Sequence, residues 1–110
     1  MGGRIVMVPT PEAWEKELAD AKAANMAVIV DFFAQWCGPC KAIAPLYETL
    51  SNENPTIVFL KVDVDENGAV AELAGVTAMP TFIVYKDGVK VDELLGASND
   101  KLKALVAKYK

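Results

Sequence analysis

The chain has 110 residues, of which 53% are hydrophobic and 24% charged, so it can bury a core and is too apolar to be mainly disordered. We expect residues 1–110 to form a single domain, since this length is close to the commonest domain size. The formal net charge is −4 and the lysines are scattered along the sequence, which predicts neither a nucleic-acid nor a membrane-surface partner.

The N-terminal stretch, residues 1–8, holds one arginine and a short apolar run. This run is too brief for a signal peptide or a membrane-spanning helix. Gly2 is present, but Val6 stands where a myristoylation signal needs Ser or Thr. We therefore expect a cytoplasmic protein, with an organellar form left after removal of a transit peptide as the alternative.

The first predicted elements are a strand over residues 5–8 and a helix over residues 11–24. Thr10 is placed to cap this helix, and a proline occupies its first position. Trp14 lies on the apolar face of the helix and is expected in the core. The apolar run 27–33 is typical of a central strand buried on both faces.

A second helix is predicted to begin at Cys37, and Pro45 inside it should kink it. Residues 57–62 form the next apolar strand. Asp65 is placed to cap a short helix that ends near Gly75. The buried face of the second helix comprises Ile43, Leu46, Tyr47 and Leu50.

Residues 81–85 and 89–95 are predicted to be antiparallel strands, because Asp87-Gly88 between them is a strong hairpin signal. Ser98 or Asn99 caps the last helix, whose buried stripe holds Leu102, Leu105, Val106 and Tyr109. The order βαβαβαββα predicts an α/β fold in which a central five-stranded mixed sheet is flanked by four helices on its two faces.

Residues 36–41, Trp-Cys-Gly-Pro-Cys-Lys, hold both cysteines of the chain. If Cys37 opens a helix, Cys40 follows one turn later on the same face, where a disulfide can close. So short a ring stabilises a fold by only about 2 kcal/mol, so its value lies in reversible chemistry. The helix N-terminus favours a thiolate and lowers the pKa of Cys37, which makes Cys37 the nucleophile and Cys40 the resolving thiol.

Two other interpretations of the cysteine pair remain. A zinc half-site would need two further ligands, and the sequence has no histidine and no third cysteine, which leaves only carboxylates or a second chain. Two ordinary core cysteines would not account for the Gly-Pro between them. A single Cys-x-x-Cys beside a strand–helix–strand pattern is typical of a redox motif, so we expect no metal.

Asp31 interrupts the central apolar strand and should lie beneath the start of the second helix. Burial there disfavours the anion and raises the pKa of the carboxyl, at about 1.36 kcal/mol for each pKa unit. Proton transfer from Cys40 would account for such a residue, with Lys61 of the neighbouring strand as its partner. The alternatives are a carboxylate facing water at a strand edge and a purely structural pair with Lys61.

Several motifs follow one another along the chain: residues 30–41, Pro45, Lys61-Val62-Asp63, Met79-Pro80-Thr81-Phe82, Asp87-Gly88 and Gly96. In order and spacing, these motifs resemble the thioredoxin family. The Cys-Gly-Pro-Cys form is specific to thioredoxins proper, whereas disulfide isomerases, periplasmic oxidases and glutaredoxins typically carry another central dipeptide. Phe33 and Gln35 depart from the tryptophan and glutamate of many bacterial members, which bears on partner preference more than on the reaction.

The resemblance implies a protein-disulfide reductase. Cys37 would attack a substrate disulfide, and Cys40 would resolve the mixed disulfide, leaving a Cys37–Cys40 disulfide. Asp31, tuned by Lys61, would deprotonate Cys40. Met79-Pro80 would be a cis peptide bond that faces the cysteines and pairs with an extended substrate segment. The implied docking surface comprises Trp36, Gly38, Pro39, Gly75, Val76, Met79, Gly96 and Ala97.

We expect a monomer with no bound cofactor. The resemblance implies that electrons come from NADPH through thioredoxin reductase and pass to peroxiredoxins, ribonucleotide reductase or methionine sulfoxide reductases. A disulfide oxidase or isomerase would use the same chemistry at a higher potential, and the Gly-Pro dipeptide argues against it. A binding module or structural subunit without redox turnover is the third class of function.

Overall fold

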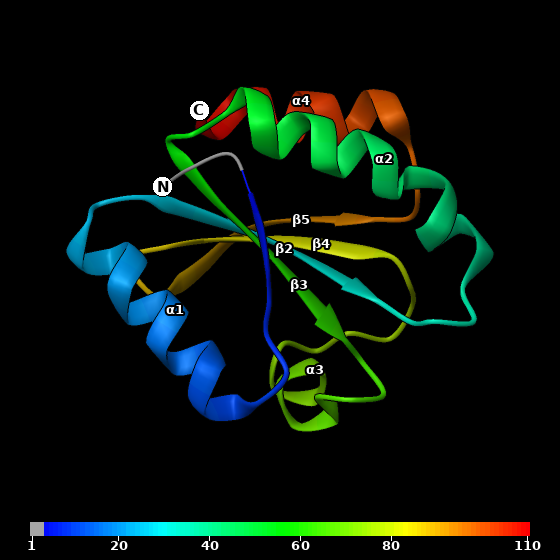
Figure 1. Cartoon of the computed structure of the whole chain (residues 1–110), viewed down its shortest axis with the longest axis horizontal. Coiled ribbons are helices and arrows are strands. Elements are labelled where there is room, and N and C mark those ends of the chain that lie inside the picture. Colours follow the sequence, from blue (N-terminus) through cyan, green and yellow to red (C-terminus); the bar gives the residue numbers. More distant parts are fainter. Residues whose placement is uncertain (1–3) are drawn as a thin grey trace.

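The computed structural model describes residues 4–110, and Figure 1 shows their arrangement. The order of elements is the βαβαβαββα expected from the sequence. The expectation for Gly2 concerns a residue outside the described part of the chain. The elements are β1 (Ile5–Met7), α1 (Pro11–Ala23), β2 (Ala27–Phe33), α2 (Gly38–Glu53), β3 (Ile57–Asp63), α3 (Gly68–Leu73), β4 (Thr81–Lys86), β5 (Val89–Leu95) and α4 (Asn99–Tyr109).

The strands form one mixed sheet in the order β1-β3-β2-β4-β5. β3 pairs in parallel with both β1 and β2, whereas β4 is antiparallel to β2 and to β5. In Figure 1, α2 and α4 lie on one face of the sheet, and α1 and α3 lie on the other. The predicted five-stranded mixed sheet flanked by four helices is confirmed.

The register between β2 and β3 positions the functional region. It places Asp31 opposite Lys61. Because parallel strands end at the same edge of a sheet, the loop after β2 and the loop after β3 meet there. Trp36 and Cys37 belong to the first of these loops, and Asp65 belongs to the second.

Each face of the sheet has its own apolar core, and each core contains an aromatic cluster. On the α1 side, the Trp14 ring lies 6.1 Å from the Phe32 ring and 5.2 Å from the Tyr85 ring, centroid to centroid. On the α2 side, Tyr47 and Phe59 stand edge to face at 5.3 Å. Trp14 is therefore a core residue, as predicted, and burial of such rings is a principal source of stability.

Two predicted helix caps and one predicted hairpin turn are confirmed. The Thr10 hydroxyl accepts a hydrogen bond from the N–H three residues on, at 3.1 Å, and starts α1. Ser98, rather than Asn99, caps α4 in the same way. Asp87 and Gly88 have φ values of 55° and 78°, the left-handed backbone that a two-residue hairpin requires.

The prediction that Asp65 caps α3 is wrong. The capping position is Asn67, whose side chain makes no capping hydrogen bond and instead donates to the Val8 carbonyl oxygen at 3.1 Å. Upstream, the Asp63 carboxylate accepts the N–H groups of Asp65 at 2.9 Å and Glu66 at 3.3 Å. This turn competes with helix formation and delays α3 until Gly68.

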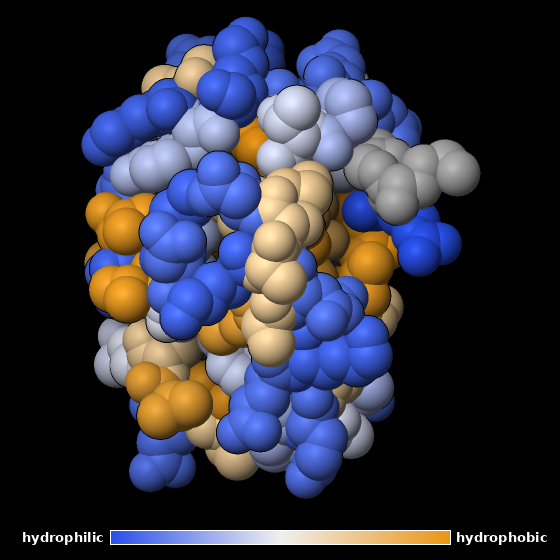
Figure 2. Space-filling model, turned by 90° about the vertical axis from the view of Figure 1, so that its left-hand side faces the viewer, coloured by the Kyte–Doolittle hydropathy of each residue, from blue (hydrophilic) through white to orange (hydrophobic). Residues whose placement is uncertain are grey.

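One side of the molecule is mostly hydrophilic (Figure 2). Figure 2 shows the side of the molecule away from the start of α2, where hydrophilic side chains separate small apolar patches. Within residues 4–110, no helix has both the length and the apolar character needed to cross a membrane. The large apolar side chains that stay exposed include Met7, Trp36, Leu73, Val89, Val91 and Leu95.

Candidate active site

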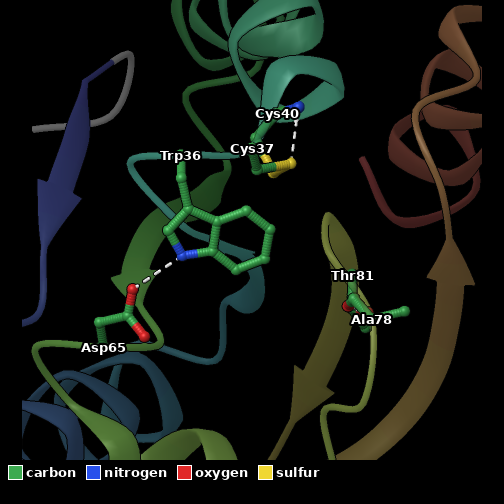
Figure 3. The surroundings of a disulfide bond; sticks show 6 residues. All are labelled: Trp36, Cys37, Cys40, Asp65, Ala78 and Thr81. Carbon is green, nitrogen blue, oxygen red and sulfur yellow. Dashed lines mark hydrogen bonds between the residues drawn. A yellow bond between two sulfur atoms is a disulfide. The ribbon is translucent and has the colours of Figure 1, made fainter.

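The two cysteines form a disulfide across the first turn of α2, with their Cα atoms 5.3 Å apart (Figure 3). Cys37 is the N-cap residue, and its sulfur accepts the backbone N–H of Cys40 at 3.1 Å. Both cysteines are 4% exposed. Gly38 and Pro39 occupy the first two helical positions and are exposed. The helix start therefore supplies a hydrogen-bond donor to the sulfur of Cys37 and can stabilise negative charge on it.

Trp36 forms an exposed wall beside the disulfide. Its side chain is 68% exposed, and its indole N–H donates to the Asp65 carboxylate at 3.1 Å. Figure 3 shows the ring standing between Asp65 and the disulfide. This hydrogen bond ties the loop after β2 to the loop after β3. Asp65 is a site residue that sequence reasoning missed, because no local pattern links it to a side chain 29 positions away.

The loop before β4 completes the surroundings of the disulfide. The Met79-Pro80 peptide bond is cis, as the family resemblance implied. Met79 is partly buried and packs against the cluster formed by Ala34 and the two cysteines. The Thr81 hydroxyl donates to the Ala78 carbonyl oxygen at 2.6 Å, and Figure 3 shows this loop across from the disulfide.

The other predicted docking residues lie in two loops. Gly96 follows β5, and its N–H donates to the Pro80 carbonyl oxygen at 2.9 Å, so Gly96 and its neighbour Ala97 adjoin the cis-proline loop. Gly75 follows α3 with φ of 76°, a conformation that favours glycine. The next residue, Val76, packs against the core on the α1 side of the sheet, which leaves only part of it free for a partner.

Asp31 is fully buried on β2. Burial raises the pKa of its carboxyl from 3.8 to about 7, and the positive charge of Lys61 opposes this rise without cancelling it. Neither carboxyl oxygen has a hydrogen-bond partner within residues 4–110. The prediction that burial raises this pKa is confirmed, and the alternative of a carboxylate facing water is wrong.

The predicted direct pairing of Asp31 with Lys61 is not formed. The two residues are opposite in register, yet no ion pair joins them in the described part of the chain. The ammonium of Lys61 lies instead 4.4 Å from the centroid of the Phe33 ring, a cation–π contact. A purely structural salt bridge is thus excluded as the reason for Asp31, and Lys61 acts on it only as a nearby charge.

A hollow of about 160 Å³ opens beside Cys40 and joins it to Lys61. A larger hollow, of about 350 Å³, lies between α1 and the strands β1 and β3 and contains neither cysteine, so size alone does not indicate the reactive region. The smaller hollow is lined by Phe33, Ala34, Gln35, Cys40, Lys41, Ala44 and Lys61.

Tyr47 is a second residue whose polar role sequence reasoning missed. Its ring belongs to the buried face of α2, as predicted, but its hydroxyl lies 2.7 Å from the Leu60 carbonyl oxygen and 3.0 Å from that of Ile29. Burial, reinforced by the charge of Asp31, raises the pKa of Tyr47. The hydroxyl therefore stays protonated and bridges β2 and β3, two residues before Asp31 and one residue before Lys61 in sequence.

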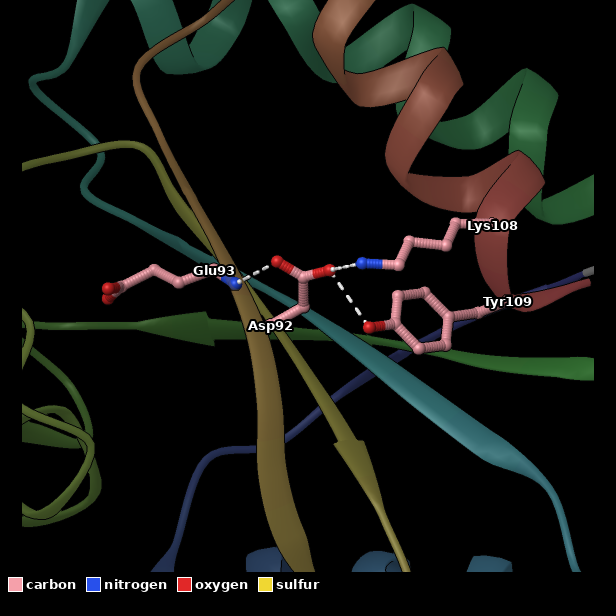
Figure 4. Close-up of polar contacts among 4 residues, drawn as sticks. All are labelled: Asp92, Glu93, Lys108 and Tyr109. Atoms are coloured by element: carbon pink, nitrogen blue, oxygen red, sulfur yellow. Dashed lines mark hydrogen bonds and ion pairs between the residues drawn. The ribbon is translucent and has the colours of Figure 1, made fainter.

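One polar cluster lies outside the cysteine region and holds α4 against the sheet (Figure 4). The Asp92 carboxylate of β5 accepts the Lys108 ammonium at 2.9 Å and the Tyr109 hydroxyl at 2.8 Å. The hydrogen bond from Lys108, followed by the one from Tyr109, lowers the pKa of Asp92. Within residues 4–110, no group of His, Cys, Asp and Glu side chains could hold a metal ion.

A Cys-x-x-Cys disulfide closed at a helix start, with a backbone donor on its first sulfur and an exposed tryptophan beside it, defines a thiol–disulfide oxidoreductase. The thioredoxin family model matches residues 5–108. The chain therefore belongs to the thioredoxin family, whose members carry no prosthetic group.

Individual relatives agree with this assignment along nearly the whole chain. The H-type thioredoxin of Chlamydomonas reinhardtii is 61% identical over 110 residues, which cover 99% of this chain and 97% of that protein. The structure of Plasmodium falciparum thioredoxin is 48% identical, with a TM-score of 0.90 over 96% of this chain and 99% of that one. The thioredoxin NaTrxh of Nicotiana alata is 36% identical, with a TM-score of 0.92 over 97% of this chain and 93% of that one. The protein is accordingly a protein-disulfide reductase that works by dithiol–disulfide exchange.

Proposed function

We propose that Cys37 is the nucleophile and Cys40 the resolving thiol when this chain reduces disulfides in other proteins. The observation that carries the assignment is the hydrogen bond from the Cys40 N–H to the Cys37 sulfur at the start of α2. In the reduced protein, this donor and the helix dipole stabilise a thiolate on Cys37. Cys40 lies inside the first turn, and among residues 4–110 no comparable hydrogen-bond donor reaches its own sulfur.

The reaction transfers two electrons to the substrate. The Cys37 thiolate attacks one sulfur of a substrate disulfide, whose S–S bond breaks as a mixed disulfide forms and the other substrate sulfur leaves as a thiolate. Cys40 then loses its proton and attacks the Cys37 sulfur. The mixed disulfide breaks, the second substrate sulfur leaves, and the Cys37–Cys40 disulfide remains.

Asp31 takes the proton of Cys40 in this scheme. A general base works best when its pKa is near the operating pH, and the pKa of Asp31 is about 7. The proton would pass through a water molecule between the Cys40 thiol and the buried Asp31 carboxyl, which does not line the hollow beside Cys40. Lys61, held over Phe33, keeps the pKa of Asp31 from rising further.

The substrate docks on the surface around the disulfide. We assign this docking surface to Trp36, Met79-Pro80 and the two glycine-containing loops. These groups either lie around the sulfur atoms or adjoin the loop that contains Met79 and Pro80. The backbone of Met79 would offer hydrogen bonds to an extended substrate segment. The docking set is Trp36, Gly38, Pro39, Gly75, Val76, Met79, Gly96 and Ala97.

The electron donor we propose is NADPH, acting through thioredoxin reductase. The acceptors are peroxiredoxins, ribonucleotide reductase and methionine sulfoxide reductases. A dithiol that must be reduced before each turnover suits the cytoplasm, where thiols are kept reduced, and we assign the chain to that compartment as a monomer.

The test is reduction of insulin disulfides with dithiothreitol as electron source. The intact chain should accelerate the reaction, and Cys37→Ser should abolish the acceleration. Cys40→Ser should instead trap a mixed disulfide that is visible by mass. A folded, reduced wild-type chain that gives no acceleration would remove the reductase mechanism and favour a binding module.

A further inference from the structure

The hollow beside Cys40 is positively charged, although the chain as a whole carries a net charge of −4. Lys41 and Lys61 line it, and no carboxylate does. Neither lysine forms an ion pair with any part of residues 4–110. We propose that this hollow receives a carboxylate side chain next to the cysteine of a disulfide substrate, so that the protein prefers acidic segments. The inference rests on the proposed function and adds a substrate class to it.

The acidic groups nearest the hollow do not compete for the two ammonium groups. Asp31 is fully buried, and it makes no ion pair with Lys61 within residues 4–110. Asp63 is 7% exposed, and its carboxylate is occupied by the Gln35 amide at 3.3 Å and by backbone N–H groups of the turn before α3. The positive charge at the hollow is thus left for a partner.

Position and size suit a substrate side chain. The hollow has Cys40 in its wall, whereas Cys37 and the docking residues do not line it, so a substrate side chain would reach it from a residue that flanks the substrate cysteine. Its volume of about 160 Å³ corresponds to about five waters, enough for a carboxylate with part of its hydration. Each exposed ion pair contributes little, so we expect two lysines to give a preference of about fivefold for an acidic over a neutral substrate. This preference acts mainly on the rate of encounter and on the alignment of the bound substrate.

The experiment compares two peptides that carry the same intramolecular disulfide, one with Glu and one with Gln beside each cysteine. We expect the wild-type chain to reduce the Glu peptide with about fivefold higher kcat/KM at low ionic strength, and we expect added salt to erode the difference. Lys41→Gln should reduce the preference to about twofold or less, without changing the rate on the Gln peptide. The matched control is Lys22→Gln in the last turn of α1, which ends on the opposite side of Figure 1 from the start of α2, and it should keep the wild-type preference.

Equal kcat/KM for the two peptides with the wild-type chain would overturn the inference and leave the reductase mechanism standing. So would an equal loss of preference in Lys41→Gln and Lys22→Gln, because the effect would then be one of net charge. Sulfate added at constant ionic strength should slow only the Glu peptide. If it slows both peptides alike, the hollow binds free anions and not substrate carboxylates. Reduction of neither peptide would count against the proposed function itself.

Discussion

The buried charge of Asp31 should make the oxidised protein less stable as the pH rises. The pKa of its carboxyl is about 7 in the folded protein, against 3.8 for an unperturbed group. The folded state thus binds the proton more tightly than the unfolded state, and stability falls between those two values. At about 1.36 kcal/mol for each pKa unit, the full loss is about 4 kcal/mol and is complete above pH 7.

Asp31→Asn removes the titration while nearly keeping the shape of the side chain. At about pH 8.5, the oxidised variant should be about 4 kcal/mol more stable than the wild type, whereas near pH 4 the two should be almost equal. Guanidinium chloride unfolding at several pH values, followed by circular dichroism, measures the difference. The control is Glu48→Gln, which neutralises an exposed carboxylate on α2 and should give no comparable pH-dependent gain.

The reasoning would be refuted by a difference between Asp31→Asn and wild type that stays constant across this pH range. It would fail equally if the variant were the less stable protein at high pH. Either result would mean that the carboxylate finds compensation that its buried, unpartnered position does not provide.

Three further results are expected. Tyr47→Phe should cost about 1–3 kcal/mol in chemical unfolding, because two buried strand carbonyls lose a donor. Trp36→Phe loses the hydrogen bond to Asp65 at an exposed site, so unfolding should shift by less than about 1 kcal/mol while KM for insulin rises. Asp92→Asn should give a small loss of stability at neutral pH. That loss should vanish in acid as the wild-type carboxyl, whose pKa is lowered by Lys108, becomes protonated, and high salt should also reduce it.

Much of this molecule was predictable from neighbouring residues alone. The apolar run that forms β2, the caps at Thr10 and Ser98, and the hairpin at Asp87-Gly88 all depend on side chains a few positions apart. The cysteine pair is equally local, since a helix start and a spacing of three place both sulfur atoms on one face.

Contacts between distant segments were decided only by the tertiary structure. Asp65 looked like a helix cap, yet its carboxylate binds Trp36 from another loop, because parallel strands bring the two loops to one edge of the sheet. Lys61 was expected to pair with Asp31, and the sheet register does set them opposite each other, but the ammonium lies over Phe33.

The hollow beside Cys40 is another feature that depends on contacts between distant segments. Its wall combines residues from β2, the following loop, α2 and β3, and no stretch of sequence contains them all. Backbone conformation and burial follow from short-range periodicity, so the sequence by itself determined the fold and the reactive dithiol. Which buried or charged group meets which partner depends on how strands align and helices pack, so only the tertiary structure decided the surroundings of Asp31 and the charge beside the disulfide.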